Sequence, residues 1–257
     1  MHSRFGAAPS RHTLHCQAIV QHMSDFSVII PTLQRADELS AIVAKCASHP
    51  RVLEVLVINN APAPLDWDSP KVRVLQQSEN IYVNPAWNLG AREARGKYLA
   101  ILNDDISFNT SIFEKLIPWL KLPFVGIIGP SLQCFSADAD RGLNLRPTLR
   151  LPPGFGTAMF MNAKNYTNIP EQIRVYFGDD WLFQAQTGVN FKMTSFAFRT
   201  PGSVTSSDAS FSPIKEEDRE WALSHNILEG PYTRRYGRIL RLRESRLGIA
   251  LSRHRST

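Results

Sequence analysis

The sequence has few cysteines and no long apolar run. Its three cysteines, Cys16, Cys46 and Cys134, are widely spaced and form no Cys-x-x-Cys pair, which argues against a disulfide framework or a zinc knuckle. It contains no run of 18 apolar residues, so a membrane-spanning helix is excluded. We therefore expect a protein of a reducing compartment, located in the cytoplasm and, if its tail binds lipid, at the periphery of a membrane.

Several common catalytic motifs are also missing. The chain has no Walker motif, no His-Glu-x-x-His motif and no Gly-x-Ser-x-Gly elbow, so it gives no support to P-loop, zinc-protease or serine-hydrolase chemistry. Gly154 and Gly156 superficially resemble a dinucleotide fingerprint. However, position 159 is Met, and Pro152-Pro153 stands where a strand is required. A dinucleotide cofactor is therefore excluded.

Positive charge is concentrated at the C-terminal end of the chain. The 257 residues carry a formal net charge of +6, with 43% hydrophobic and 20% charged residues, a composition typical of globular proteins. Residues 231–257 contain eight arginines and a single acidic residue, Glu244, which gives this segment +7 and leaves −1 for the rest. A polyanionic partner is therefore expected at the tail.

The sequence divides into three parts. Residues 1–25 lack hydrophobic periodicity and are expected to form a disordered N-terminal extension. Residues 26–230 form the folded domain. In residues 231–257, isoleucine and leucine side chains interleave with the arginines, which predicts a basic amphipathic helix. Such a helix suits packing on the domain, binding to nucleic acid or contact with an anionic membrane.

Apolar runs alternate with helical periods in the first half of the domain. Strands are predicted over 26–30, 52–58, 72–75, 97–102 and 125–129, and helices over 36–47, 85–95 and 111–120. This alternation is typical of an α/β fold whose mostly parallel sheet is covered on both faces. After residue 135 the pattern weakens. There we expect a helix over 175–187, a strand over 190–198 and helices over 214–223 and 233–251.

Polar residues follow three of the predicted strands. Ligands of parallel sheets bind beyond the carboxyl ends of the strands, so these residues are predicted to converge on one site. The segments are Pro31-Thr32, Asn59-Asn60 and Asn103-Asp104-Asp105.

Asp104 and Asp105 form an adjacent acidic pair directly after an apolar strand. Neighbouring carboxylates at a buried strand end repel each other and lose hydration, so a compensating cation is expected. Mg²⁺ or Mn²⁺ uses a few carboxylate oxygens and completes its shell with water and phosphate. The alternative is that the pair caps the helix near Ser111, which the five intervening residues make a poor fit.

Asp179 and Asp180 form a second acidic pair, flanked by aromatic residues. A carboxylate beside apolar rings tends to hold a proton, which suits a general base. The alternative is that Asp179 caps the following helix. The two interpretations are compatible if Asp179 is the cap and Asp180 reaches into the site. We expect Gly156, Thr157 and Trp181 to contact an acceptor. At Gly156 and Thr157 the small side chains let the backbone approach a sugar or acceptor closely.

The order and spacing of these motifs resemble nucleotide-sugar glycosyltransferases of the GT-A fold, close to the family-2 type. The resemblance covers residues 26–218: residues 27–32 resemble the first strand and nucleotide-binding turn, 55–60 the second strand, and 80–96 the helix before the metal motif. It implies a mostly parallel sheet flanked by helices, a smaller acceptor-side subregion and a C-terminal helical tail.

The resemblance also implies roles for individual residues. It places Mn²⁺ or Mg²⁺ on Asp105 with Asp104, and the general base on Asp180 beside Asp179. Many members add a histidine ligand, but residues 200–212 contain none, so we expect either weak metal affinity or Asp208 as the substitute ligand. The nucleotide sugar would contact Pro31, Thr32, Asn59, Asn60, Asn84, Asn88 and Asp104.

The implied activity is inverting transfer of a sugar from a nucleoside diphosphate to an acceptor hydroxyl. The family usually has an aspartate where this chain has Asn59-Asn60. Asparagine can still bond a uracil edge, which favours a UDP-sugar but leaves the nucleotide open. The acceptor is a glycan, a lipid-linked sugar, a protein or a modified DNA base. The last follows from a looser resemblance to short phage enzymes that glycosylate DNA.

Two other functions stay open from the sequence. A nucleotidyltransferase would also need paired carboxylates and a metal, but it usually has a glycine-rich basic loop after the first strand, where this chain has Leu33-Gln34-Arg35. A nucleic-acid-binding protein without catalysis would bind phosphates through the arginine-rich tail.

Overall fold

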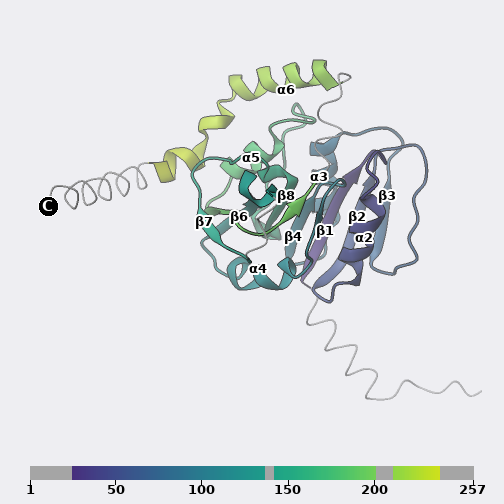
Figure 1. Cartoon of the computed structure of the whole chain (residues 1–257). Helices are drawn as coiled ribbons and strands as arrows, with labels where there is room; N and C mark the ends of the chain where they lie inside the picture. The colour runs from purple at the N-terminus through teal and green to yellow at the C-terminus, as the bar shows by residue number, and fades with distance from the viewer. Residues whose placement is uncertain (1–24, 137–141, 201–210, 238–257) are drawn as a thin grey trace, which may run out of the picture.

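The central sheet of the computed structural model has the strand order β3-β2-β1-β4-β8-β6-β9-β7 (Figure 1). The structure describes residues 25–136, 142–200 and 211–237. Within them β8 runs antiparallel to both β4 and β6, and β7 runs antiparallel to β9, while the other neighbours are parallel. The strands are β1 (Phe26–Thr32), β2 (Val52–Asn59), β3 (Val72–Gln76), β4 (Tyr98–Leu102), β6 (Val125–Pro130), β7 (Leu145–Pro147), β8 (Ala158–Asn162) and β9 (Val189–Met193).

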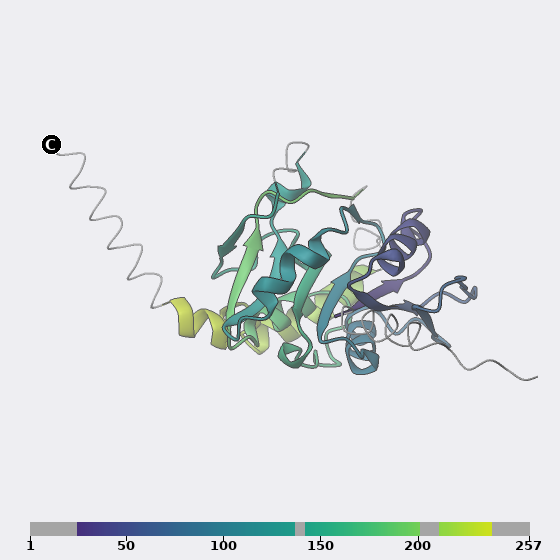
Figure 2. The same cartoon turned by 90° about the horizontal axis from the view of Figure 1, so that it is seen from below.

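Helices cover both faces of this sheet. In Figure 1, α4 lies at the bottom of the view and α6 at the top, and Figure 2 views the molecule from the α4 side. Short 3-10 turns join several elements, and β5 (Ser107–Phe108) pairs with β10 (Phe198–Arg199) in a small separate sheet. The helices are α2 (Leu39–Ser48), α3 (Val83–Glu93), α4 (Ile112–Leu120), α5 (Gly178–Gln184) and α6 (Ser212–Ser224).

The core consists of two apolar clusters, one on each face of the sheet. Because side chains alternate along a strand, Val28 and Ile30 of β1 pack with α2 and α4, whereas Ile29 packs with Trp87 of α3 and Leu182 of α5. Strands β1, β2 and β4 are buried along nearly their whole length. Their continuous apolar runs in the sequence follow from this burial.

The predicted α/β fold with a mostly parallel sheet is confirmed, with three differences in its second half. The chain forms two additional antiparallel strands, β8 in the centre of the sheet and β7 at its edge. The strand expected over 190–198 ends at Met193, because residues 198–199 leave the main sheet to pair with β5. The helix expected over 175–187 forms only over Gly178–Gln184.

The start of the basic tail packs on the domain. Residues 231–237 are helical, and the buried Tyr232 hydroxyl donates to the Thr148 carbonyl at 2.8 Å and accepts from the Asn190 N–H at 2.9 Å. The Tyr236 hydroxyl donates to the Thr187 carbonyl. Packing on the domain is therefore observed for this part of the tail. Residues 238–257, residues 1–24 and Asp208 lie outside the described residues.

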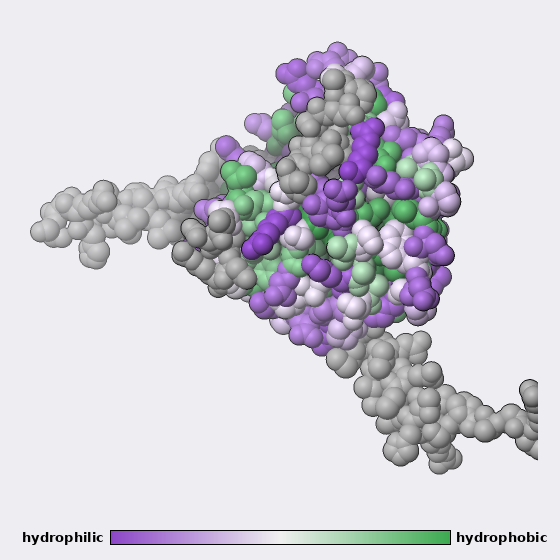
Figure 3. Space-filling view, turned by 45° about the vertical axis from the view of Figure 1, so that its right-hand side comes forward, coloured by the Kyte–Doolittle hydropathy of each residue, from purple (hydrophilic) through white to green (hydrophobic). Residues whose placement is uncertain are grey.

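The surface of the described residues mixes polar and apolar side chains, as one face shows in Figure 3. Across those residues, no helix combines the length and the apolar character that crossing a lipid bilayer requires. Large exposed apolar side chains come from separate places in the chain: Leu122, Phe124, Leu132, Leu223 and Leu228.

Candidate active site

A cavity of about 490 Å³ lies at the carboxyl ends of β1, β2 and β4. This volume is within the range of small-molecule sites. Both acidic pairs line it, so the two clusters that the sequence placed 75 residues apart face one space. The lining residues are Pro31, Thr32, Leu33, Asn60, Asn80, Tyr82, Val83, Trp87, Asn103, Asp104, Asp105, Gly154, Gly156, Thr157, Val175, Tyr176, Phe177, Asp179, Asp180 and Phe211.

Asp104 and Asp105 occupy the turn that follows β4. The Thr32 hydroxyl, at the end of the neighbouring β1, donates to Asp104 Oδ2 at 2.6 Å, and the Thr200 hydroxyl donates to Asp105 Oδ2 at 3.3 Å. Burial, with the Asp105 charge adding to it, raises the pKa of Asp104 to about 6. A cation beside the pair would offset this repulsion and favour the ionised form.

This end of the cavity has the donor set of a hard divalent cation. Two carboxylates face the cavity, and Mg²⁺ is commonly bound by one or two carboxylates together with substrate phosphates. In residues 25–136, 142–200 and 211–237, no group of three or more His, Cys, Asp or Glu side chains could hold a metal ion. The residues present therefore fit a cation that takes its remaining ligands from phosphate and water.

Asp179 and Asp180 lie in the first turn of α5 and also line the cavity. The N-cap of α5 is Phe177, not Asp179, although Asp179 Oδ1 accepts a hydrogen bond from the Asp180 N–H at 3.1 Å. Asp179 also packs closely on Gly156, where a Cβ would lie 2.5 Å from Asp179 Oδ2. Glycine at position 156 therefore makes room for this carboxylate.

Both carboxyls of this second pair hold protons more strongly than an exposed aspartate. Burial raises the pKa of Asp179. Burial, followed by the charge of Asp179, raises the pKa of Asp180 to about 7. Because this value is near neutral pH, Asp180 can accept a proton from a hydroxyl more readily than an ordinary aspartate can. This is the property predicted for a general base.

Two aromatic residues that line the cavity have an unusual backbone. Tyr82, before α3, has φ 67°, and Phe177, before α5, has φ 61°. Positive φ is strained for bulky side chains, and such strain often accompanies functional sites. The Tyr82 ring lies edge-on to Phe211, with centroids 6.4 Å apart. Tyr82 and Phe211 together form an aromatic wall of the cavity that both acidic pairs line.

The side chains that line the cavity carry negative but no positive charge. Four are aspartates, and among the described residues that line it none is lysine or arginine. Two cations of the described residues lie against aromatic rings that line the cavity: the Arg174 guanidinium is 5.3 Å from the Tyr82 ring centroid, and Lys215 Nζ is 5.5 Å from that of Tyr176. An anionic ligand in this cavity would therefore meet four aspartates, and no lysine or arginine among the described residues that line it.

Four residues of the predicted site do not line the cavity. Asn59 is buried and shapes the turn after β2: its Nδ2 donates to the Ala63 carbonyl and to Gln76 Oε1. Asn88 Nδ2 donates to the Ile169 carbonyl, while Asn88 Oδ1 accepts from the Tyr166 hydroxyl. These amides connect parts of the chain around the site.

Asn84 and Trp181 also bond to neighbouring loops. Asn84 Nδ2 donates to the carbonyls of Ile173 and Tyr176 at 3.1 and 3.0 Å. Trp181 Nε1 donates to the Asn168 carbonyl at 3.0 Å. The direct ligand contacts that the sequence analysis assigned to these four residues stay predictions. Pro31, Thr32, Asn60, Gly156 and Thr157, in contrast, line the cavity as expected.

Sequence reasoning did not find Asn80, Tyr82 and Phe211. Asn80 Oδ1 accepts from the Tyr82 N–H at 2.9 Å, an Asx turn that the Asn-x-Tyr segment before Pro85 could have indicated. Phe211 had no local signal, because the start of α6 brings it to the cavity from far along the chain.

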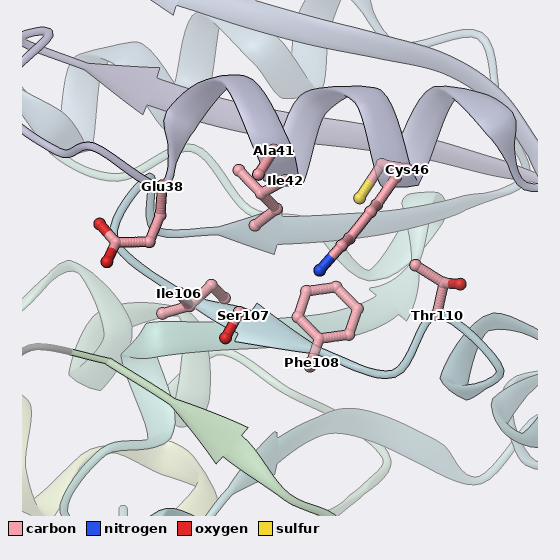
Figure 4. A pocket seen from close by; sticks show the side chains of 9 residues that line it. Glu38, Ala41, Ile42, Cys46, Ile106, Ser107, Phe108 and Thr110 are labelled. Atoms are coloured by element: carbon pink, nitrogen blue, oxygen red, sulfur yellow. The ribbon is translucent and has the colours of Figure 1, made fainter.

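A second, much smaller cavity of about 30 Å³ lies between α2 and β5 (Figure 4). Its lining includes Cys46, and burial raises the pKa of this thiol to about 12. Reactive cysteines need a lowered pKa, so Cys46 is a structural residue. Cys46 and Cys134 are both buried and free.

Comparison with known proteins bears on the identity of this site. A model of the family described as Glycosyl transferase family 2 matches residues 27–186, more than half of the chain. The match contains the ends of β1, β2 and β4 and both acidic pairs. No curated protein matches the sequence.

Solved structures show the same fold at low sequence identity. The 1–349 fragment of S. aureus TarS has a TM-score of 0.54 and 14% identity, with 83% of this chain and 72% of the fragment covered. The same protein in complex with UDP-GlcNAc gives 0.56 and 14%, covering 77% and 66%. GalNAc-T7 with UDP, GalNAc and Mn²⁺ gives 0.53 and 11%, covering 70% and 44%.

These findings confirm the GT-A type of fold and the resemblance on which it was predicted. Structures this distant in sequence support the fold alone, whereas the family match extends over the residues that line the cavity except Phe211. Glycosyl transfer, rather than nucleotidyl transfer, is the chemistry of the matched family. The chain is a glycosyltransferase and belongs to glycosyl transferase family 2.

Proposed function

We propose that the protein is an inverting glycosyltransferase that uses a UDP-sugar as donor and the hydroxyl of a second molecule as acceptor. The observation that carries this proposal is that Asp104-Asp105 and Asp179-Asp180 line one cavity. A structural neighbour is described with UDP-GlcNAc and another with UDP, GalNAc and Mn²⁺, which supports a uridine nucleotide as the carrier.

The donor lies at the ends of β1, β2 and β4 in this proposal. Asn60 lines the cavity there, and its Oδ1 accepts a long 3.4 Å hydrogen bond from the Ile81 N–H, so its amide suits the donor and acceptor edge of a uracil. Asp104 and Asp105 would hold Mn²⁺ or Mg²⁺. When bound, this cation supplies positive charge that stabilises the departing diphosphate.

The transfer is a single displacement at the anomeric carbon. The acceptor oxygen forms a bond to this carbon as the bond from the carbon to the diphosphate oxygen breaks, and the bonding electron pair leaves with the diphosphate. Asp180 takes the proton of the attacking hydroxyl. Because attack occurs on the face opposite to the leaving group, the anomeric configuration inverts. The cavity holds both reactants in line, which lowers the entropic barrier.

UDP binding is expected to depend on a divalent cation. Four aspartates and no lysine or arginine line the cavity among the described residues, so the diphosphate alone meets only negative charge. We expect UDP with Mn²⁺ to raise the melting temperature, by an amount that follows RT ln(1 + [L]/Kd), whereas UDP with EDTA raises it little. An equal shift with EDTA would contradict the proposed donor site. GDP and ADP serve as controls for the nucleotide.

The rate of transfer is expected to fall as the pH decreases through about 7. Burial and Asp179 raise the pKa of Asp180 to about 7, and the base acts only when it is deprotonated. Below this pH, kcat/KM should therefore decrease by about tenfold per pH unit, as for one essential ionisation. The measurement is UDP release between pH 5 and 9 with saturating Mn²⁺. A flat profile from pH 5 to 8 would argue against Asp180 as the base.

The identity of the acceptor and the role of the tail are further parts of this proposal. The aromatic wall of Tyr82 and Phe211 suits a molecule with an apolar face, such as a sugar ring, and this favours a glycan or lipid-linked sugar among the predicted acceptors. Contact of residues 238–257 with nucleic acid or an anionic membrane stays a prediction. So does the cytoplasmic location.

A further inference from the structure

Asp218 of α6 has a fully buried carboxylate that takes part in three backbone hydrogen bonds. Its Oδ1 accepts from the Arg174 N–H at 2.9 Å, and its Oδ2 accepts from the N–H groups of Val175 and Tyr176, both at 2.8 Å. Burying a carboxylate is costly unless hydrogen bonds compensate it, and hydrogen bonds to a charged acceptor are stronger than neutral ones. The three N–H groups supply this compensation.

The same stretch of backbone is bonded on its other side by α3. Asn84 Nδ2 donates to the carbonyls of Ile173 and Tyr176, and the Asn84 N–H donates to the Arg174 carbonyl at 2.9 Å. The backbone of residues 173–176 is therefore bonded to α3 through its carbonyls and to α6 through its N–H groups. Two helices that are distant in sequence fix one short loop.

This loop leads directly into the second acidic pair. Phe177 follows it with φ 61°, and α5 begins at Gly178. Gly178 packs against Asn84, where a Cβ would lie 2.0 Å from Asn84 Oδ1. The direction in which the first turn of α5 leaves the loop therefore depends on the fixed backbone before it. That direction determines where the carboxylates of Asp179 and Asp180 point.

We propose that Asp218 is a positioning residue for the Asp179-Asp180 pair, acting through the backbone of residues 174–176. The inference rests on the proposed role of Asp180 as base. Asp218 itself does not line the cavity. Within α6 only Asp218 and Ala222 are buried, so the carboxylate is a principal attachment of this helix to the loop. Loss of the attachment is expected to shift the base and leave the donor side in place.

The test compares Asp218→Asn with Glu220→Gln, which makes the same charge change at an exposed position of the same helix. We expect D218N to lower kcat for UDP release from UDP-GlcNAc by about tenfold to 100-fold, since misplacement by about 1 Å can cost 10²-fold. The KM for UDP-GlcNAc and the thermal shift with UDP and Mn²⁺ should change less than about twofold. E220Q should match the wild type in all of these.

Hydrogen exchange tests whether Asp218 holds the backbone of residues 174–176, and it does so without reference to activity. The amides of residues 174–176 should exchange faster in D218N than in the wild type and E220Q, at a temperature well below the melting temperature of each protein. Unchanged exchange together with unchanged kcat in D218N would overturn the proposal. If D218N does not fold, Asp218→Glu retains the charge but moves the carboxylate by one methylene, and wild-type kcat in D218E would likewise overturn it.

Failure of the proposed function would be distinct. A wild-type protein whose melting temperature is raised by none of UDP-GlcNAc, UDP-GalNAc and UDP-glucose in the presence of Mn²⁺ would contradict the donor assignment. The exchange experiment would then still report whether Asp218 holds the backbone of residues 174–176.

Discussion

Replacing Asp180 by asparagine is expected to lower sugar transfer by about 10²–10⁴-fold, the usual contribution of a general base. Asparagine keeps the shape of the side chain but cannot accept a proton from the attacking hydroxyl. The pKa of Asp180, raised to about 7 by burial and by Asp179, makes this carboxyl an effective base near neutral pH. UDP release at saturating donor and Mn²⁺ measures the effect.

Donor binding should survive this substitution, because Asp180 lies on α5 while the proposed donor site is at the strand ends. The melting-temperature increase with UDP and Mn²⁺ should therefore stay close to that of the wild type. Glu171→Gln, an exposed change in the loop before α5, is the matched control and should be fully active. Full turnover in D180N would show that another group removes the proton.

Replacing Asp105 by asparagine is expected to weaken cation-dependent donor binding. Asp105 is 7% exposed and lines the cavity beside Asp104. The substitution removes one of the two charges that would hold Mn²⁺. Changes to groups that only support metal ligands cost 10–100-fold in affinity, so loss of a ligand should raise the Mn²⁺ concentration needed for UDP stabilisation by at least about 100-fold. A Mn²⁺ titration monitored by thermal shift with UDP measures it.

The fold of the D105N protein should be intact, and without UDP its melting temperature should not fall, because the change relieves repulsion within the acidic pair. Asp66→Asn, an exposed change far along the chain from this pair, controls for the loss of one negative charge. If D105N and D66N need the same Mn²⁺ concentration, the metal is not held at Asp105.

Strands β1, β2 and β4, whose ends form the proposed donor site, could be predicted because their hydrophobic pattern is local in the sequence. Strands β1, β2 and β4 are buried on both faces and therefore read as continuous apolar runs. Their polar ends follow directly in sequence. Strand β8 was missed because Ala158 to Met161 follows a glycine- and proline-rich loop and shows no alternation. Only its pairing with β4 and β6 makes it a strand.

The roles of individual side chains were less accessible to the sequence. Asn84 and Asn88 are four residues apart and share one face of α3, but the sequence does not state whether that face meets the cavity or a loop. In the structure both amides bond to the segment that precedes α5. Asp218 was equally hidden, because its three partners lie more than 40 residues earlier.

The reversed direction of β8 decides which loop meets the carboxylates of the cavity. In the register of β8 with β4, Ala158 at the start of one strand lies opposite Leu102 at the end of the other. The chain therefore enters β8 at the edge where it leaves β4, and this brings Gly156 and Thr157 to the carboxylates. A parallel strand here would have delivered its entering loop to the far edge. If this loop contacts the acceptor, as we propose, its length and sequence can diverge and alter what is glycosylated, while the strand ends proposed to hold the nucleotide stay unchanged.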